Sequence, residues 1–266
     1  MSNLIVNPLG SKLQIAPSNY YLTPDMYVNL GITRPDVEWR FANGITFDKD
    51  GSVYHNHGKT LLSTGLTDGV APSLVTSPIG WGKRALNFNR STNYLQIADA
   101  AMLNITTQNF SIAAWVRNTN PAAYQFVVGK GANTSTAQGY ALYTNASNWL
   151  FDVSDGVDVV EVYTPITANA WSFVVVTVDA GASASIFLNG VFKQSASLAA
   201  VGSLTCPARP FTVGMRENGG SYYFPGDQAW IAFWDGVAVS TAEQLALYNA
   251  MNKGSLTTPR PPIWAL

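Results

Sequence analysis

Apolar and polar residues alternate with a period of two along most of the chain beyond residue 41. In the run 110–117, every second residue from Phe110 to Val116 is apolar, and Trp115 falls on the other face. This period is typical of a β-strand, since successive side chains point to opposite sides. Similar runs predict strands at 86–88, 94–97, 125–130, 140–144, 149–154, 158–163, 210–215 and 228–236. The pattern predicts an all-β protein with two antiparallel sheets packed as a sandwich.

Two stretches place strands within this sandwich. Residues 171–179, WSFVVVTVD, are apolar on both faces, which is typical of a strand in the middle of a sheet. Asn189-Gly190 separates two short apolar runs and is the preferred pair for a type I′ turn, because both turn positions need a positive φ. Residues 184–195 are therefore predicted to form a β-hairpin.

The N-terminal residues 1–40 lack a sustained period, and prolines interrupt their short apolar runs. Proline removes a backbone donor and restricts the residue before it, so we expect no long helix there. Two interpretations stay open: an extended N-terminal arm, or one or two strands packed on the body.

The C-terminal part predicts one short helix. Ser240 and Glu243 have the spacing of a capping box, and Gly254 is a typical helix stop. The proline-rich tail after it is expected to be extended and to dock on its own domain or on a neighbour, because its apolar end would be costly to leave in water. The expected organisation is an arm at 1–40, a β body at 41–254 and a tail at 255–266.

Composition excludes several classes of partner. Charged residues make up only 12% of the chain, and 15 basic side chains nearly balance 16 acidic ones. Nucleic-acid-binding proteins usually show a basic excess, so we expect no nucleic acid as a partner. We also expect no membrane partner, since no apolar run reaches the roughly 18–20 residues of a bilayer span. Low charge and 47% hydrophobic residues favour a homo-oligomer.

The single cysteine, Cys206, excludes an intramolecular disulfide and is expected to be a buried apolar residue. The first residues have neither the basic stretch nor the continuous apolar run of a secretory signal peptide. We therefore expect synthesis in a reducing compartment.

Several motifs resemble the laminin G-like jelly rolls of the concanavalin A-like lectin/glucanase superfamily, over about residues 42–252. They follow one another in the order of that family. They are WGKRALNF (81–88), STNYLQI (91–97), NFSIAAWVR (109–117), VVGKG (127–131), NAWSFVVVTVD (169–179), SIFLNGVF (185–192), FTVGM (211–215) and the closing stretch 222–248. The resemblance implies a two-sheet jelly roll. It also implies that Trp115 could lie on the concave sheet where lectins and glucanases hold sugars, or that the arm or a loop covers it.

Sugar binding needs an aromatic platform beside hydrogen-bonding side chains. The glycine-rich loop RENGGSYYFPGD (216–227) offers both. The predicted carbohydrate-binding residues are Tyr222, Tyr223, Asn218, Asp227 and Trp115, with Tyr124, Tyr143 and Trp149 as further candidates. The alternative is that these aromatic side chains fill the sandwich or a subunit interface.

No catalytic residues are predicted. Glycoside hydrolases of the superfamily carry a Glu-x-Asp-x-x-Glu strand, and a retaining mechanism needs two carboxylates about 5–5.5 Å apart. The nearest stretch contains Asp155, Asp158 and Glu161 at a different spacing, and Gly156 marks it as a hairpin turn. Alternation would place Asp158 and Glu161 on opposite faces of a strand.

No metal site is predicted, although calcium is left open as a cofactor. His55 and His57 would face the same way on an extended chain, but a third ligand from Asp48, Asp50 or Glu38 would be needed. A β-turn at Asp50-Gly51 explains this stretch more simply. The oxygens available for calcium belong to Asp99, Asp152, Asp155, Glu217, Asn218 and Asp227, without a dense acidic loop.

These observations predict a non-enzymatic virion protein of a bacteriophage, with a capsid decoration or tail-associated role. It would be made in the host cytoplasm, would lie on the virion surface, and would bind other virion proteins or itself through its arm and tail. One alternative is a lectin-like module that recognises cell-surface carbohydrate. A second alternative is a laminarinase-like glycoside hydrolase.

Overall fold

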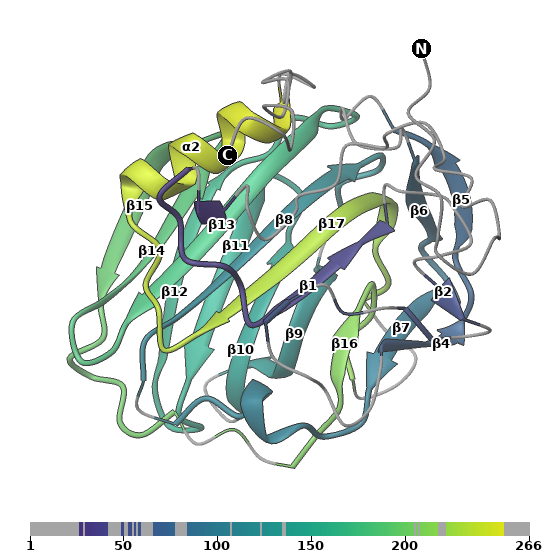
Figure 1. The fold of residues 1–266 in the computed structure, drawn as a ribbon. Coiled ribbons are helices and arrows are strands. Elements are labelled where there is room, and N and C mark those ends of the chain that lie inside the picture. Colours follow the sequence, from purple (N-terminus) through teal and green to yellow (C-terminus); the bar gives the residue numbers. More distant parts are fainter. Residues whose placement is uncertain are drawn as a thin grey trace, which may run out of the picture.

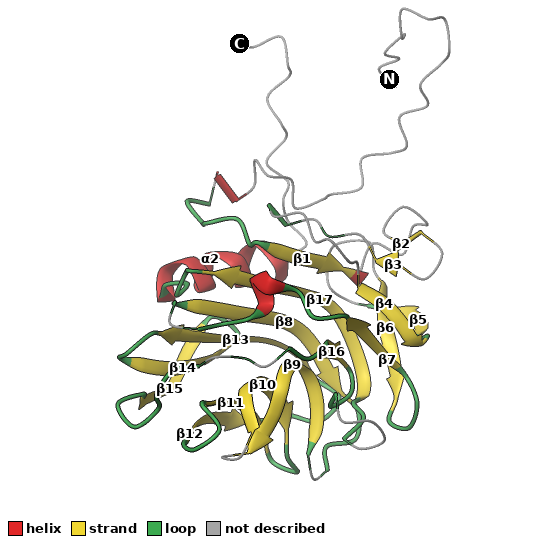
Figure 2. Cartoon of the chain, turned by 90° about the horizontal axis from the view of Figure 1, so that it is seen from below, coloured by secondary structure: helices red, strands yellow, loops and turns green. Residues whose placement is uncertain are grey.

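Two antiparallel β-sheets are stacked face to face in the computed structural model of the protein (Figures 1 and 2). This arrangement confirms the predicted sandwich. The structure describes residues 27–28, 30–41, 49–50, 53–54, 56, 58–59, 66–77, 84–106, 108–122, 124–134, 137–204, 206, 208–217 and 222–252.

The first sheet, called sheet A here, has eight strands among the described residues. Their order is β15-β14-β13-β8-β17-β6-β5, and β1 pairs with β17 beyond the stretch that β6 occupies. The strands are β1 (Val37–Arg40), β5 (Ser73–Thr76), β6 (Arg84–Asn89), β8 (Phe110–Asn118), β13 (Trp171–Asp179), β14 (Ser183–Leu188), β15 (Val191–Ser197) and β17 (Pro225–Asp235). Strand β13 lies between β14 and β8, as its two apolar faces predicted.

The second sheet, called sheet B, has nine strands in the order β12-β11-β10-β9-β16-β7-β4-β3-β2 within the described part of the chain. They are β2 (Lys49–Asp50), β3 (Val53–Tyr54), β4 (Leu66–Val70), β7 (Tyr94–Ile97), β9 (Gln125–Thr134), β10 (Ala137–Thr144), β11 (Asn148–Ser154), β12 (Val159–Pro165) and β16 (Phe211–Val213). A 3-10 turn, η2 (Ala101–Leu103), follows β7.

The main core lies between the sheets and is built from alternate residues of each strand. Ile112 and Val176 from sheet A and Leu142 and Phe151 from sheet B belong to this one buried cluster. Such interdigitation of two inner faces is what holds a sandwich together. The hairpin between β14 and β15 turns at Asn189 and Gly190, whose φ angles of 55° and 76° confirm the predicted type I′ turn.

Helix α2 (Thr241–Asn252) lies over the outer face of sheet A (Figure 2). The capping box is confirmed, because the backbone N–H of Ser240 donates to Glu243 Oε2 at 2.8 Å and the N–H of Glu243 donates to Ser240 Oγ at 3.3 Å. Leu247 and Met251 of the helix join Trp115 in a second buried cluster on this face. Sheet A is therefore apolar on both sides.

Strand β1 extends sheet A at strand β17. It pairs antiparallel with β17 from Val37↔Phe233 to Arg40↔Trp230. Just before it, the indole N–H of Trp234 donates to the carbonyl of Thr33 at 2.7 Å. Residues 1–26 and the tail 255–266 lie outside the described residues, so the division of the chain at residues 40 and 254 stays a prediction.

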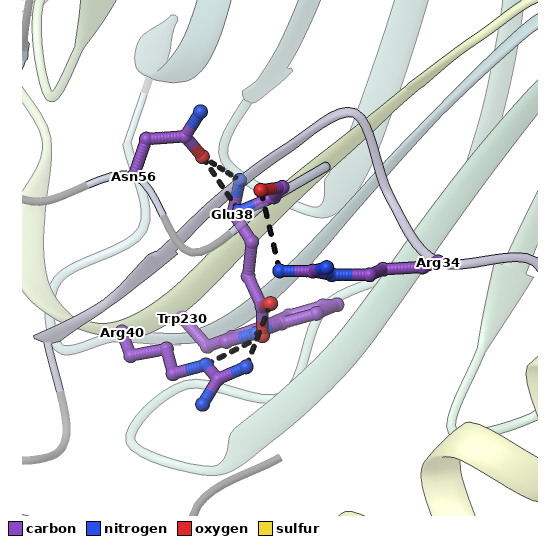
Figure 3. A network of polar contacts seen from close by, with 6 residues as sticks. Arg34, Glu38, Arg40, Asn56 and Trp230 are labelled. Atoms are coloured by element: carbon purple, nitrogen blue, oxygen red, sulfur yellow. Dashed lines mark hydrogen bonds and ion pairs between the residues drawn. The ribbon is translucent and has the colours of Figure 1, made fainter. Parts of the chain in front are cut away.

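A buried ion pair fastens β1 to the sheet (Figure 3). The guanidinium of Arg40 donates to both carboxylate oxygens of Glu38, at 2.8 and 2.9 Å, and the indole N–H of Trp230 donates to Glu38 Oε1 at 2.8 Å. The backbone N–H of Glu38 donates to Asn56 Oδ1 at 2.8 Å. Glu38 is fully buried and Arg40 nearly so. A charge taken out of water in this way needs such partners, since an unpaired buried carboxylate is strongly destabilising.

We expect Arg40→Met to lower the free energy of unfolding by about 3–5 kcal/mol, because it leaves the Glu38 carboxylate buried without its cation. The double variant Glu38→Gln/Arg40→Met removes both charges and keeps an acceptor for the Trp230 indole. It should recover more than half of the loss in urea denaturation. If the double variant is as unstable as Arg40→Met, the ion pair is not the reason for the loss.

Candidate functional site

Three tyrosines form a cluster on the outer face of sheet B, the face opposite to α2. The ring of Tyr124, in the loop before β9, lies 5.8 Å from that of Tyr222 and 6.1 Å from that of Tyr143 on β10, between ring centroids. Tyr124 is 47% exposed and Tyr222 is 36% exposed. Tyr143, in contrast, is buried in a small cluster with Phe126 and Leu150. This tyrosine cluster comprises Tyr124, Tyr143 and Tyr222.

The two exposed tyrosines have unusual backbones. Tyr124 has a φ of 33° and Tyr222 a φ of 64°, a region that bulky residues rarely adopt. The carbonyl of Tyr222 accepts the backbone N–H of Phe126 at 2.8 Å, which ties the two loops together. Such strain concentrates at ligand clamps and active sites, so two strained tyrosines in mutual contact mark a candidate binding site.

A pair of carboxylates adjoins the tyrosine cluster. Asp152 on β11 lies directly opposite Glu161 on β12 in the register of the two strands. The Tyr143 hydroxyl oxygen is 2.9 Å from Asp152 Oδ2 and 3.1 Å from Glu161 Oε2. Asp152 is buried, its Oδ1 has no hydrogen-bond partner, and Glu161 is exposed. This acid pair, Asp152 and Glu161, shares Tyr143 with the tyrosine cluster.

The pKa of Asp152 is raised from its ordinary value of 3.8 to about 7. Burial is the main cause, the hydrogen bond from Tyr143 lowers the pKa, and the nearby Glu161 carboxylate raises it. Burial and the two carboxylates also raise the pKa of Tyr143 far above its ordinary range, so its hydroxyl keeps its proton. Perturbed carboxylates in clusters of this kind are typical of functional sites.

The predicted carbohydrate-binding residues are dispersed by the fold. Tyr222 is in the tyrosine cluster, and Tyr223 beside it is half-buried. Asp227 is fully buried on sheet A, where it pairs with Arg117 and accepts a 2.7 Å hydrogen bond from Asn87. Trp115 is only 3% exposed, because α2 covers it. Asn218 lies outside the described residues.

The further aromatic candidates also separate. Tyr124 and Tyr143 belong to the tyrosine cluster, whereas Trp149 is buried in the core between the sheets. Of these three rings, only that of Trp149 therefore fills the sandwich, as the alternative interpretation expected. The assignment of sugar-binding roles to the predicted residues stays a prediction.

The stretch considered for catalysis, residues 155–161, comprises the turn between β11 and β12 and the first residues of β12. The carboxylate of Asp155 accepts the N–H groups of Val157, Asp158 and Gly202 at 2.6–2.8 Å, which lowers its pKa. Asp155 therefore shapes the turn. Glu161 faces Asp152 across the two strands, a partner that the sequence pattern of a single strand did not indicate.

The acid pair could have been found from the sequence. The strands 149–154 and 158–163 and the turn at Gly156 are all predicted by the pattern, and the register of a short hairpin follows from its turn. Pairing the strands around that turn places Asp152 opposite Glu161. The contact between Tyr124 and Tyr222 had no comparable signal, since the two residues lie in separate loops.

Among the described residues, no group of three or more His, Cys, Asp or Glu side chains is placed to hold a metal ion. His55 and His57 lie outside them. Asp99 pairs with Lys130, and Glu217 with Arg209, so these two predicted calcium oxygens already face cations of the chain. Calcium binding stays a prediction.

Cys206 is a free, buried cysteine, and burial raises the pKa of its thiol to about 11. A thiol that keeps its proton is a poor nucleophile and a poor metal ligand. No helix in the part of the chain that the structure describes has the length and apolar character that a membrane crossing requires.

We expect the free energy of unfolding to fall as the pH rises from about 4 to 7, because folded Asp152 holds a proton that the unfolded chain releases. The stability that protonated Asp152 contributes is fully present below the Asp152 pKa of the unfolded chain. It is lost as the pH rises through the Asp152 pKa of the folded protein. Asp152→Asn should reduce the loss by up to about 4 kcal/mol, at about 1.4 kcal/mol per pKa unit. Urea denaturation across this pH range measures it. Equal pH dependence of both proteins would contradict the assignment to Asp152.

Comparisons with known structures find the same fold. Domain 4 of AbnA, a GH43 extracellular arabinanase from Geobacillus stearothermophilus solved in complex with arabinotriose, matches with a TM-score of 0.60 and 16% identity over 81% of this chain and 98% of that one. The binding domain of botulinum neurotoxin serotype G matches with a TM-score of 0.58 and 15% identity over 80% of this chain and 50% of that one. The binding domain of Paraclostridial Mosquitocidal Protein 1 matches with a TM-score of 0.58 and 14% identity over 82% and 52%.

The chain spans about half the length of the two toxin binding domains. At such identities the likeness concerns the fold alone. No curated protein matches the sequence. A family profile described as "Concanavalin A-like lectin/glucanases superfamily" matches residues 89–244, which is more than half of the chain and includes β8 to β17. The chain therefore belongs to the concanavalin A-like lectin/glucanases superfamily.

Proposed function

We propose that the protein is a non-enzymatic carbohydrate-binding module and that the tyrosine cluster on sheet B is its binding site. The observation that carries this proposal is the contact between Tyr124 and Tyr222, two half-exposed rings held on strained backbones. Aromatic faces give sugars an apolar platform, and the adjoining carboxylates offer acceptors for hydroxyl groups. Both kinds of contact meet at Tyr143.

The structural relatives support this direction. The AbnA domain was solved with a bound arabinotriose, and the toxin matches are binding domains by description. Because a shared fold does not fix a function, the proposal depends on the side chains of this chain. Those side chains offer exposed rings at one place on sheet B, whereas Trp115 on sheet A is covered.

Binding without hydrolysis is part of the proposal. A general acid must come within hydrogen-bonding reach of the bond that it cleaves. Asp152 is buried and its Oδ1 is sealed from solvent, so Glu161 is the exposed carboxylate of the pair. Only Glu161 of the two could therefore come within reach of a bound sugar. New reducing ends formed from a β-glucan by the wild type, but not by Glu161→Gln, would contradict this part and favour the glycoside hydrolase alternative.

The setting that we propose is the surface of a bacteriophage virion, with the module facing outward. Tyr27 and Met251, at the two ends of the described chain, lie in one cluster on the outer face of sheet A. The tyrosine cluster lies on the outer face of sheet B. Residues 1–26 and 253–266 thus join the body on the face opposite to the site, which suits attachment to a particle or to a second copy while sugars bind at sheet B.

On a glycan array, we expect the wild type to retain a set of related sugars and Tyr222→Gly to bind them at least about tenfold more weakly, because a stacking ring is lost. Glycine accepts the positive φ of this position, so the backbone should be kept. Phe192→Ala is the matched control, since it removes a 50% exposed ring on sheet A. Equal loss in both variants, or none in Tyr222→Gly, would contradict the site.

We expect deletion of residues 1–26 to abolish attachment to virions while leaving a folded body, because β1 and the residues just before it remain. Attachment is measured by co-sedimentation with particles that lack the protein. The fold is checked by thermal unfolding. Undiminished attachment of the shortened protein would contradict the role of this segment.

A further inference from the structure

We propose that the tyrosine cluster and the acid pair together select glycans that carry a protonated amine, as in a deacetylated amino sugar. This inference rests on the proposed function and names its ligand class. It is carried by three features of the described residues: two opposed carboxyl groups without a cation, a buried oxygen of Asp152 without a hydrogen-bond partner, and exposed aromatic rings in the adjoining tyrosine cluster.

The acid pair lacks a positive partner. Asp152 and Glu161 lie directly opposite each other on neighbouring strands, so ionising both would place two like charges side by side, which is destabilising. The other carboxylates of the body that have an ion pair within 4.0 Å include Glu38, Asp99, Glu217 and Asp227. Within the described chain, no Lys or Arg takes that role for the acid pair. A cation from outside would offset this repulsion and so favour the state in which both carboxyl groups are ionised.

The acid pair also has fewer hydrogen-bond donors around it than its oxygens could accept. The Tyr143 hydroxyl has one proton and contacts an oxygen of each carboxylate, so it can donate to only one of them. Asp152 Oδ1 has no donor at all, although the residue is only 5% exposed. Because this oxygen is sealed from solvent, Glu161 is the acceptor of the pair that a ligand can reach, and an ammonium group would bring it three N–H donors and a positive charge.

The neighbouring rings suit the same group. Cations are attracted to the faces of tyrosine rings within about 6 Å of the centroid. The guanidinium carbon of Arg216 already lies 5.4 Å from the centroid of Tyr222, which shows that this ring holds a cation in the chain itself. Tyr163 lies on β12, two residues from Glu161 and opposite Leu150 of β11. It adds a 47% exposed ring on the outer face of sheet B. Rings and carboxylates thus favour one charge type.

The experiment compares three β-1,4-linked tetramers that differ only at carbon 2: glucose with a hydroxyl, N-acetylglucosamine with an acetamide and glucosamine with an amine. Calorimetric titration at pH 6.5 and low salt should give the glucosamine tetramer an affinity at least about tenfold higher than the other two. Glu161→Gln should bring the three affinities within about twofold of one another. Asp179→Asn, which removes an exposed carboxylate at the end of β13, is the matched control and should keep the preference.

Each outcome decides between the two proposals. Equal binding of the three tetramers that is lost in Tyr222→Gly would overturn the amine selectivity and leave the proposed function standing. An amine preference that persists in Glu161→Gln, or that Asp179→Asn also removes, would overturn the role of the acid pair. If no tetramer binds, the amine inference is wrong, and the glycan array with Tyr222→Gly alone decides the proposed function.

Discussion

The structure depends on burying both faces of sheet A. Its strands carry apolar side chains toward sheet B and also toward the outside, where Trp115 and Phe173 would otherwise meet water. Helix α2 and the segment before β1 cover that outer face, so both ends of the described chain are held there. An apolar sheet face of this size would otherwise be a site of association. On the outer face of sheet B, no element of the described chain covers Tyr124 and Tyr222 in this way.

Covering sheet A also explains why charged residues are buried there. Strand β1 occupies the edge of β17 that β6 leaves free, and it brings Glu38 and Arg40 beneath the surface. Mutual pairing and the Trp230 indole satisfy these groups. A buried ion pair adds little net stability over apolar residues. It does favour one register between β1 and β17, because a shifted register would leave a buried charge without its partner. The pair thus specifies how the N-terminal segment docks.

Much of the body could be predicted from local pattern, because alternation, an Asn-Gly turn and a capping box are decided by neighbouring residues. Strand β1 agrees with one of the two interpretations left open for residues 1–40, but the sequence could not decide between them, since proline punctuation and two charges in VEWR also fit an exposed segment. The alternation predicted that Trp115 faces away from its strand's core side, but which element covers it depends on the tertiary fold. The strain at Tyr124 and Tyr222 is likewise invisible in sequence, as φ angles follow from loop packing.

The contrast between the two outer faces gives the site its character. On sheet A, the buried carboxylates have cationic partners: Asp227 has Arg117, and Glu38 has Arg40. On sheet B, the acid pair has no cationic partner within the described chain, both carboxyl groups contact the Tyr143 hydroxyl, and Asp152 Oδ1 has no hydrogen-bond partner. Among the buried side-chain atoms of the described residues that lack a hydrogen-bond partner, Asp152 Oδ1 is the one carboxylate oxygen, and it lies in the pair that adjoins the strained, exposed rings. A ligand that supplies donors and positive charge would complete this face as the ion pairs complete the other.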